Sequence, residues 1–199
     1  MQPQQLSSFF ELCHLAERLK SELRHSWLAS GRQESVAEHC WRLSLMLILI
    51  EPHLQKSIEL SKVLKMAIIH DLVEAIVGDT PVFEIDQAGA LVKAEKEQQA
   101  IEKIREILSN SVGDEIYAYW QEFELAESYE AKLVYAFDKL ECKCQHLEAD
   151  LSTWNDKEKA CSFDWQDALY DFDPAVLQVR DYLLSQSQEK VKKEVESVG

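Results

Sequence analysis

The sequence predicts an all-α protein with a single domain. Apolar residues recur every three or four positions along most of the chain, which is typical of helices that turn one face to a core. Gly and Pro number only 5 and 4 among 199 residues, whereas an all-β protein needs many tight turns. Hydrophobic residues make up 46% of the chain, which is enough for one buried core at this length.

Capping patterns mark the first two expected helices. The first is expected over residues 8–24, where Ser8 and Glu11 have capping-box spacing. The second begins at Ser35, which has Glu38 three positions later, and ends before a proline at position 52. Two helices joined by a polar loop are therefore expected before residue 52.

Periodicity and helix-ending residues predict the remaining elements. A third helix is expected over 59–77, with Gly78 ending it and Thr80-Pro81 opening a new helix. Later elements are expected over 90–108, 114–125, 128–151, an aromatic piece at 163–172, and a last helix that opens at Asp173-Pro174. We interpret residues 1–199 as one domain, with its motif-bearing core at about 6–150 and a C-terminal helical extension at about 151–199.

Composition limits the partners and the location of the protein. With 21 Lys and Arg against 36 Asp and Glu, the net charge of −15 argues against a nucleic-acid polymer or an anionic membrane as a partner. A small phosphate ligand is still compatible, because one metal ion can reverse the local field. Five cysteines without a CxxC pair, and an N-terminus without a basic region, favour a cytoplasmic protein.

The most informative stretch places His70 and Asp71 side by side among apolar residues. Burying both groups costs free energy unless something compensates for their lost hydration. A divalent metal would do so, since imidazole and carboxylate groups bind Mn, Fe, Co, Ni or Zn. Glu74 shares their helix face and could orient a metal-bound water.

Two further potential ligands, His39 and Asp138, lie in other helical segments with apolar neighbours. Taken singly, His39 could be a hydrogen-bonded core histidine, and Asp138 could pair with a nearby Lys or Arg. Taken together with His70 and Asp71, they would let three antiparallel helices meet at one point. Two His and two Asp leave at least two positions open on an octahedral ion, which suits catalysis better than a closed structural site.

These residues carry a family resemblance. The pattern His39…His70-Asp71…Asp138 resembles the H…HD…D signature of the HD-domain phosphohydrolase superfamily. The flanking runs, Glu34-Ser-Val-Ala-Glu-His39 and His70-Asp71-x-x-Glu74-Ala-x-x-Gly78-Asp79, are similar to the subgroup of bacterial 5′-deoxynucleotidases and their eukaryotic relatives. The resemblance covers roughly residues 6–150 and implies an HD-domain helical bundle.

The resemblance also implies roles for individual residues. The metal ligands would be His39, His70, Asp71 and Asp138. Glu74 and Asp71 would be catalytic, with Glu74 positioning or deprotonating the attacking water.

Substrate-binding residues follow from the same resemblance: Arg24, His25, Trp27 and Asp79. Asp79 would face the sugar hydroxyl, although a turn that ends a helix also explains an Asp there. In the deoxynucleotidase branch a Trp directly follows the Arg, but here His25 follows Arg24 and the Trp comes at 27. This departure leaves the substrate preference open, and a surface Arg at a helix C-terminus is the alternative reading of Arg24.

The sequence therefore predicts a metal-dependent phosphomonoester hydrolase, a 5′-deoxynucleotidase in particular, with one divalent ion (Mn, Co, Fe, Mg, Ni or Zn). Its expected substrate is a small phosphorylated compound such as a nucleotide, and a homodimer is expected. One alternative is an HD hydrolase that acts on a cyclic nucleotide, a nucleoside triphosphate or a non-nucleotide ester. Others are a metal-stabilised binding module without turnover and a helical adaptor.

Overall fold

Helices make up most of the chain, as the sequence predicts. The structure, a computed structural model, describes residues 1–81, 86–161 and 167–198. Its helices are α1 (Pro3–Ala16), α2 (Val36–Ile50), α3 (Leu60–Ile69), α4 (Glu74–Val77), α5 (Gln87–Leu108), α6 (Ser111–Leu125), α7 (Tyr129–Glu148), α8 (Asp156–Cys161) and α9 (Pro174–Val198). A small antiparallel sheet is formed by β1 (Leu23–Trp27) and β2 (Gln33–Ser35).

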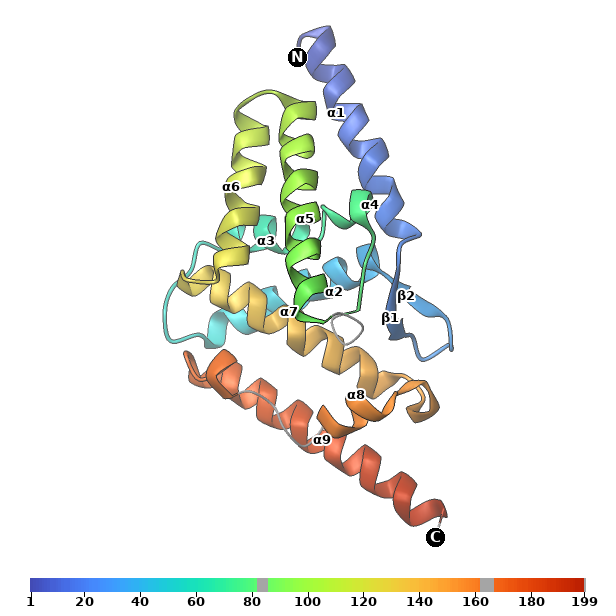
Figure 1. The fold of residues 1–199 in the computed structure, drawn as a ribbon. Helices are drawn as coiled ribbons and strands as arrows, with labels where there is room; N and C mark the ends of the chain where they lie inside the picture. Colours follow the sequence, from blue (N-terminus) through green and yellow to red (C-terminus); the bar gives the residue numbers. More distant parts are fainter. Residues whose placement is uncertain (82–85, 162–166, 199) are drawn as a thin grey trace.

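The helices pack in two groups that meet at α7 (Figure 1). Helices α5 and α6 form an antiparallel pair, and α1 lies alongside α5. Helix α7 crosses the foot of this pair and packs against α2, α3 and α6. Helix α9 runs along the other side of α7, and the two chain termini lie at opposite ends of the molecule.

The prediction for the first helix is wrong at both ends. Helix α1 begins at Pro3, so Ser8 and Glu11 lie inside it and do not cap it. It ends at Ala16, well before the end of the expected range 8–24.

A β-hairpin takes the place of the end of that helix. Leu23 pairs with Ser35, and Trp27 pairs with Gln33. The backbone groups of β1 thus find partners on β2, a tertiary contact that overrides the local helical spacing of the side chains. As a result, Arg24 lies on a strand next to the start of α2, and not at a helix C-terminus.

The predicted start of α2 is confirmed. The Ser35 hydroxyl accepts a hydrogen bond from the backbone N–H of Glu38 at 3.4 Å, and the Glu38 carboxylate accepts one from the Ser35 backbone N–H at 2.9 Å. The reciprocal pair is a capping box, and it fixes the first turn of the helix. His39 follows directly after this fixed turn, and the helix ends at Ile50 as expected.

The expected helix over 59–77 is divided into α3 and α4. His70 and Asp71 lie at the break between the two helices, and not within a continuous helix. Gly78 ends α4 as predicted, with a φ of +79°. The helix expected to open at Thr80-Pro81 would continue into residues 82–85, which lie outside the described residues.

Later helix boundaries differ from the expected ones by a few residues. Helix α5 begins earlier than expected because Asp86 caps it, accepting from Gly89 N at 2.7 Å. Helix α7 begins after Ser128 as predicted but ends at Glu148. The last helix opens at Pro174 as predicted. Of the aromatic piece expected at 163–172, residues 163–166 lie outside the described residues, and the rest includes a short 3₁₀ helix at Asp167–Leu169.

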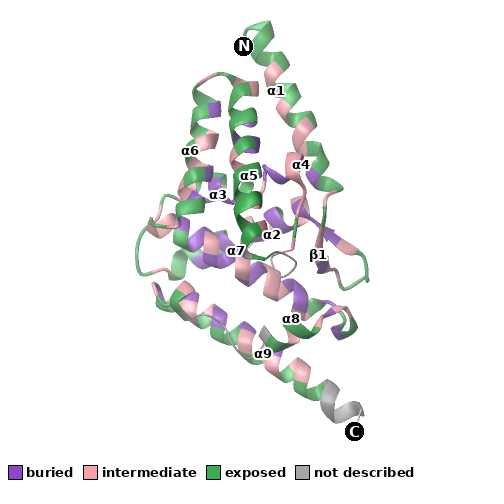
Figure 2. Ribbon diagram, in the orientation of Figure 1, coloured by how far each residue is buried: buried purple, intermediate pink, exposed green. Residues whose placement is uncertain are grey.

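Two buried apolar clusters form the core. Figure 2 shows buried residues gathered on α2 and α7, while α1, α5 and α6 expose much of their surface. One cluster includes Leu43, Met66 and Phe137, and the other includes Val36 and Ile69. The two clusters meet where α2, α7 and the end of α3 approach one another, and the predicted metal ligands lie at this junction.

Candidate metal centre

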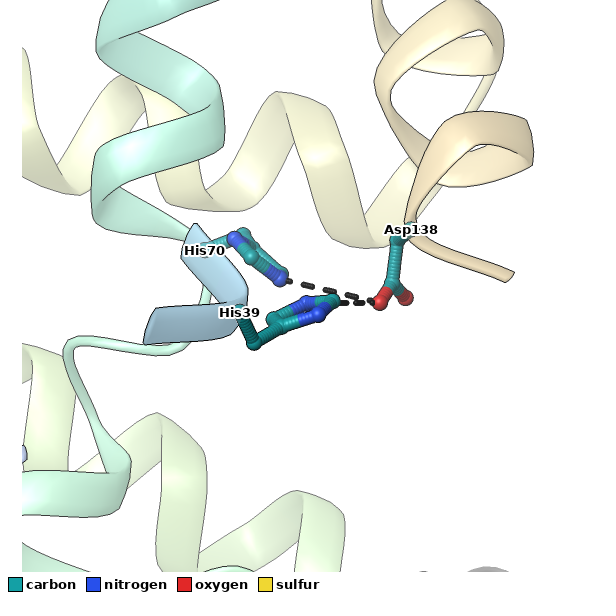
Figure 3. A group of neighbouring side chains, drawn as sticks. All are labelled: His39, His70 and Asp138. Carbon is teal, nitrogen blue, oxygen red and sulfur yellow. Dashed lines mark ion pairs between the residues drawn. The ribbon is translucent and has the colours of Figure 1, made fainter. Parts of the chain in front are cut away.

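Three predicted ligands from separate helices point at one another (Figure 3). His39 comes from the first turns of α2, His70 from the end of α3 and Asp138 from the middle of α7. Asp138 Oδ1 lies 3.1 Å from His39 Nε2 and 3.9 Å from His70 Nε2. The convergence that the sequence pattern predicts is therefore present.

Asp71, the fourth predicted ligand, joins the same group. Its Oδ2 lies 3.2 Å from His70 Nε2 and 3.8 Å from His39 Nε2. Its side chain is 17% exposed, whereas the two imidazoles are almost fully buried. Asp71 thus lies on the side of the cluster that faces solvent.

The cluster has the spacing and the chemistry to hold a divalent metal ion. The Nε2 atoms of His39 and His70 are buried and have no hydrogen-bond partner among the described residues. Donor atoms that lie about 2.1 Å from one ion are about 3.0–3.5 Å apart, close to the separations found here. The residues therefore fit a metal with nitrogen and oxygen ligands.

The electrostatics favour positive charge at this point. Burial alone would raise the pKa of Asp71, but His70, His39 and Arg24 hold that pKa well below its usual range. Burial would also raise the pKa of Asp138, but Lys139 and the two histidines lower it. Both carboxylates are therefore ionised and available as ligands.

The other ring nitrogen of each histidine is already bound by protein. Nδ1 of His70 lies 2.9 Å from the carbonyl of Ala67, and Nδ1 of His39 contacts the Glu141 carboxylate. The second oxygen of Glu141 accepts from Arg42 Nε at 2.7 Å. These partners fix the rings so that both Nε2 atoms face the centre.

Sequence reasoning missed Glu141. It lies three residues after Asp138, so both carboxylates share one face of α7, and that spacing is the signal that could have found it. It is fully buried, and its partner Arg42 also contacts Glu148 at 2.9 Å.

Two neighbouring groups of potential ligands are less suitable for a metal. Cys40 lies near His70 and Asp71, but burial raises the pKa of its thiol, so the thiolate that a metal needs is disfavoured. Glu34 and Glu141 face His39 from the other side, where Arg42 and Arg24 already supply positive charge. The His39–His70–Asp71–Asp138 group remains the best candidate.

A cavity of about 380 Å³ opens next to the predicted metal ligands. This volume is within the range typical of small-molecule sites. Its lining comes from β1, α5, α7, α8 and the segment around α4. The lining residues are Arg24, His25, Ser26, Asp71, Glu74, Asp79, Thr80, Pro81, Lys93, Asp138, Lys139, Cys142, Lys143, His146, Lys157 and Glu158. Several cationic side chains therefore surround this cavity although the whole chain is strongly acidic.

Glu74 lies in this cavity beside Asp71. It is 5% exposed, and its Oε2 atom has no hydrogen-bond partner among the described residues. Burial and the carboxylates of Asp71 and Asp79 raise its pKa to about 10. Positive charge brought to the neighbouring centre would lower that pKa and so let Glu74 accept a proton.

Arg24 reaches the cavity from β1. Its Nη1 lies 3.4 Å from Asp71 Oδ2, and its Nε lies 3.6 Å from Glu34 Oε2. The side chain is 13% exposed, so the alternative of a surface arginine at a helix end is wrong. A guanidinium held beside the predicted metal ligands is well placed to bind a phosphate.

Asp79 also lines the cavity. Burial raises its pKa, while Arg24 opposes the increase. Its backbone N–H donates to Glu22 Oε1 at 3.0 Å, and the preceding Gly78 has a backbone conformation that L-residues rarely adopt. This turn directs Asp79 toward the cavity.

His25 and Trp27 lie on the same strand, but only one of them reaches the cavity. Among the described residues the lining includes His25, whereas Trp27 contacts the His25 ring edge-to-face at a centroid distance of 4.8 Å. The structure thus places His25 at the cavity wall and Trp27 next to it.

The family assignment follows from sequence comparison. A family model of the HD domain matches residues 16–175. The chain belongs to the HD-domain family. The match includes all four predicted ligands and also helix α8, and it confirms the resemblance found in the sequence.

Named relatives agree with this assignment. A 5′-deoxynucleotidase HDDC2 of Dictyostelium discoideum is 36% identical over 151 residues, which cover 72% of this chain and 78% of that protein. The human protein of the same name is 29% identical over 143 residues, with coverage of 71% and 68%.

A solved structure has the same HD-domain fold along nearly the whole chain. It is described as a predicted metal-dependent phosphohydrolase from Magnetospirillum magnetotacticum. It has a TM-score of 0.78 and 25% sequence identity, and the superposition covers 96% of this chain and 97% of that one. Within the described part of the chain, no helix combines the length and apolar character needed to cross a bilayer.

Proposed function

We propose that this protein is a metal-dependent phosphohydrolase that cleaves deoxyribonucleoside 5′-monophosphates to deoxynucleosides and phosphate. The observation that carries the proposal is the convergence of two imidazoles and two ionised carboxylates beside a cavity with Arg24 and Glu74. The relatives named 5′-deoxynucleotidase support the choice of substrate.

The metal ligands would be His39, His70, Asp71 and Asp138. A divalent metal in such a site lowers the pKa of water and polarises a phosphoryl oxygen. The metal that is bound depends on which ions are available, because sites with nitrogen and oxygen ligands accept several divalent ions.

Glu74 and Arg24 act on the reacting groups. Glu74 accepts a proton from the attacking water as the new P–O bond forms, and the proton is then available to the 5′ oxygen as the old P–O bond breaks. Arg24 donates charge-assisted hydrogen bonds to the phosphate, whose negative charge it offsets. Asp71 is both a ligand and the closest carboxylate to Arg24.

Asp79 is placed to bind the sugar. Its carboxylate lines the same cavity as Glu74 and can accept a hydrogen bond from the hydroxyl of the deoxyribose. His25 lies at the cavity wall and would contact the nucleoside part of the substrate.

A phosphate-release assay tests the proposal. The protein is stripped with a chelator, reloaded with Mn²⁺, Co²⁺, Mg²⁺, Ni²⁺, Fe²⁺ or Zn²⁺, and incubated with deoxynucleoside and ribonucleoside monophosphates, a cyclic nucleotide and a nucleoside triphosphate. We expect metal-dependent release of phosphate and deoxynucleoside from the deoxyribonucleoside monophosphates. Failure to release deoxynucleoside from any of them, with every metal, would remove the proposal.

An exposed apolar stripe on α2 supports a homodimer. Trp41, Leu45, Ile48 and Leu49 lie at helical spacing on one face, and each is at least 39% exposed. Exposed apolar patches on helices often mark contacts between proteins. We propose that two copies of the chain associate through this face.

We also propose that the chain forms one domain with a C-terminal helical extension, and that the protein is cytoplasmic. Val176 and Leu183 of α9 belong to the larger apolar cluster, which supports a C-terminal extension that is part of one folded unit. Four cysteines, Cys13, Cys40, Cys142 and Cys144, are free in the described part of the chain, which fits a reducing cytoplasm.

A further inference from the structure

Arg24 lies between a carboxylate at the cavity and a second carboxylate behind it. On the cavity side its Nη1 donates to Asp71 Oδ2 at 3.4 Å. On the opposite side its Nε lies 3.6 Å from Glu34 Oε2. Among the described residues, the lining of the cavity includes Arg24 and Asp71 but not Glu34. Glu34 therefore reaches the cavity only through the guanidinium.

The contact between Arg24 and Glu34 is shielded from solvent. The Glu34 side chain is 2% exposed, and that of Arg24 is 13% exposed. Arg24 Nε and Glu34 Oε2 are both buried, and neither atom has a hydrogen-bond partner within the described part of the chain. Because opposite charges attract more strongly where water is excluded, these two atoms hold each other in place.

The β-hairpin fixes the position of Glu34. Leu23 of β1 pairs with Ser35 of β2, so Arg24 and Glu34 come next along the two paired strands. The Gln33 side chain adds a link across the hairpin, because its Nε2 donates to the Arg24 carbonyl at 3.3 Å. The backbone therefore sets where the Glu34 carboxylate lies before any substrate binds.

Arg42 holds Glu34 from the other side. Arg42 Nη2 lies 3.9 Å from Glu34 Oε1 and 2.7 Å from Glu141 Oε1. Glu34 thus lies between two guanidinium groups and offsets their mutual repulsion. Burial and Glu141 raise the pKa of Glu34 to about 7, while Arg24, His39 and Arg42 oppose the increase.

We propose that Glu34 is the positioning residue for Arg24, which it holds at Nε so that the Nη groups face the phosphate of the substrate. This inference rests on the proposed phosphohydrolase function. Arginine binds a phosphate through two N–H groups in a fixed planar fork, so its orientation matters as much as its charge. A guanidinium that is already oriented loses less conformational entropy when the phosphate binds.

A double-mutant cycle tests this role. Wild type, E34Q, R24A and E34Q/R24A are loaded with Mn²⁺ and compared at about pH 8, where a carboxylate with a pKa near 7 is ionised. Isothermal titration gives the Kd for inorganic phosphate, and steady-state kinetics give KM and kcat on deoxyribonucleoside 5′-monophosphates. We expect E34Q to raise the phosphate Kd about 10-fold in the wild-type background and less than twofold in the R24A background.

E38Q is the matched control. Glu38 also pairs with an arginine, Arg32, at 2.7 Å, but its side chain is 42% exposed. Glutamine at this position can still accept from the Ser35 backbone N–H and so keeps the cap of α2. We expect E38Q to bind phosphate with the affinity of the wild type.

R24K tests the same contact from the other side and does not depend on the folding of E34Q. Lysine keeps the positive charge but lacks the planar fork that contacts Glu34 and a phosphate at once. We expect R24K to raise the phosphate Kd about as much as E34Q does. Thermal unfolding confirms that each variant is folded.

Three outcomes would overturn the role of Glu34: an unchanged phosphate Kd in E34Q, an equal loss from E34Q in the R24A background, or wild-type affinity in R24K. A loss of Mn²⁺ affinity in E34Q large enough to explain its phosphate Kd would also overturn it, because Glu34 would then act through His39. If the wild type binds phosphate but hydrolyses no nucleotide, the proposed function fails, while the phosphate affinities still decide whether Glu34 positions Arg24.

Discussion

The two ring nitrogens of His39 face different surroundings: one faces the candidate metal centre and the other contacts the protein interior. Nε2 faces Asp138 at 3.1 Å, while Nδ1 contacts Glu141, whose other oxygen accepts from Arg42. A carboxylate on the far side of the imidazole fixes the ring orientation and raises its basicity as a ligand. Glu141 is therefore a positioning residue for the metal.

Replacing Glu141 should weaken metal binding. We expect E141Q to lower the affinity for Mn²⁺ 10- to 100-fold, because the glutamine no longer holds His39 with a charged oxygen. E148Q is the matched control, since Glu148 also contacts Arg42 but its side chain is 54% exposed and lies away from His39. Isothermal titration with Mn²⁺ measures both variants, and equal affinities would show that Glu141 does not position the ligand.

Glu74 should matter for turnover and not for metal binding. We expect E74Q to lower kcat by about 10²–10⁴, the usual loss when a general base is removed, while one metal ion per chain remains bound. Elemental analysis of the dialysed protein gives the metal content, and phosphate release gives kcat. Loss of the metal together with activity would instead make Glu74 a ligand, and full activity would exclude it as the base.

At the scale of elements, the turn after α4 brings Asp79, the residue proposed to bind the sugar, to the cavity. Gly78 has φ +79° and ψ 159°, a region that is almost restricted to glycine. A Cβ at this position would also lie 3.2 Å from Glu22 Oε1, the atom that accepts from the backbone of Asp79. Any side chain at residue 78 would thus disturb both the turn and the carboxylate that follows it.

G78A and G31A form a matched pair for this turn. Both glycines have positive φ, but no atom lies within 4 Å of a Cβ built on Gly31. We expect each variant to lose about 1–3 kcal/mol of unfolding free energy from backbone strain, and G78A alone to raise KM. Urea unfolding and steady-state kinetics would check this; an unchanged KM in G78A would separate the turn from substrate binding.

The sequence predicts helices well where side-chain spacing and a cap agree. The start of α2 follows from the Ser35–Glu38 pair, which needs no contact outside its own turn. The hairpin of β1 and β2 does not follow, because the residues before Trp27 also have helical spacing and the partner strand decides between the two structures. The break at His70 is likewise invisible in a run of apolar residues.

At the scale of the whole molecule, the site lies where two apolar clusters meet. The four candidate ligands could be found in the sequence because His and Asp are chemically distinctive among apolar neighbours. Glu141 was not found in this way. The part of the cavity wall formed by His146 and Glu158 could not be predicted either, because both look like ordinary surface residues until the fold brings α8 against α7. Burial and missing hydrogen bonds, which distinguish His146, are properties of the folded chain.

The α2 stripe predicts the assembly state. We expect the wild type to have twice its chain mass of 23.0 kDa in light scattering, and W41E to be a monomer, because a charge in an apolar contact loses its hydration. L125E is the control, since Leu125 and Trp41 are both 67% exposed but Leu125 lies on α6. A monomeric wild type, or a dimeric W41E, would rule out this contact.

The metal centre is tested most directly by anomalous diffraction from crystals grown with Mn²⁺. We predict one strong manganese peak per chain, at about 2.0–2.3 Å from His39 Nε2, His70 Nε2, Asp71 and Asp138, with at least one coordination position directed into the cavity beside Glu74. A peak bound by other residues, or a site closed on all sides by protein, would contradict this account.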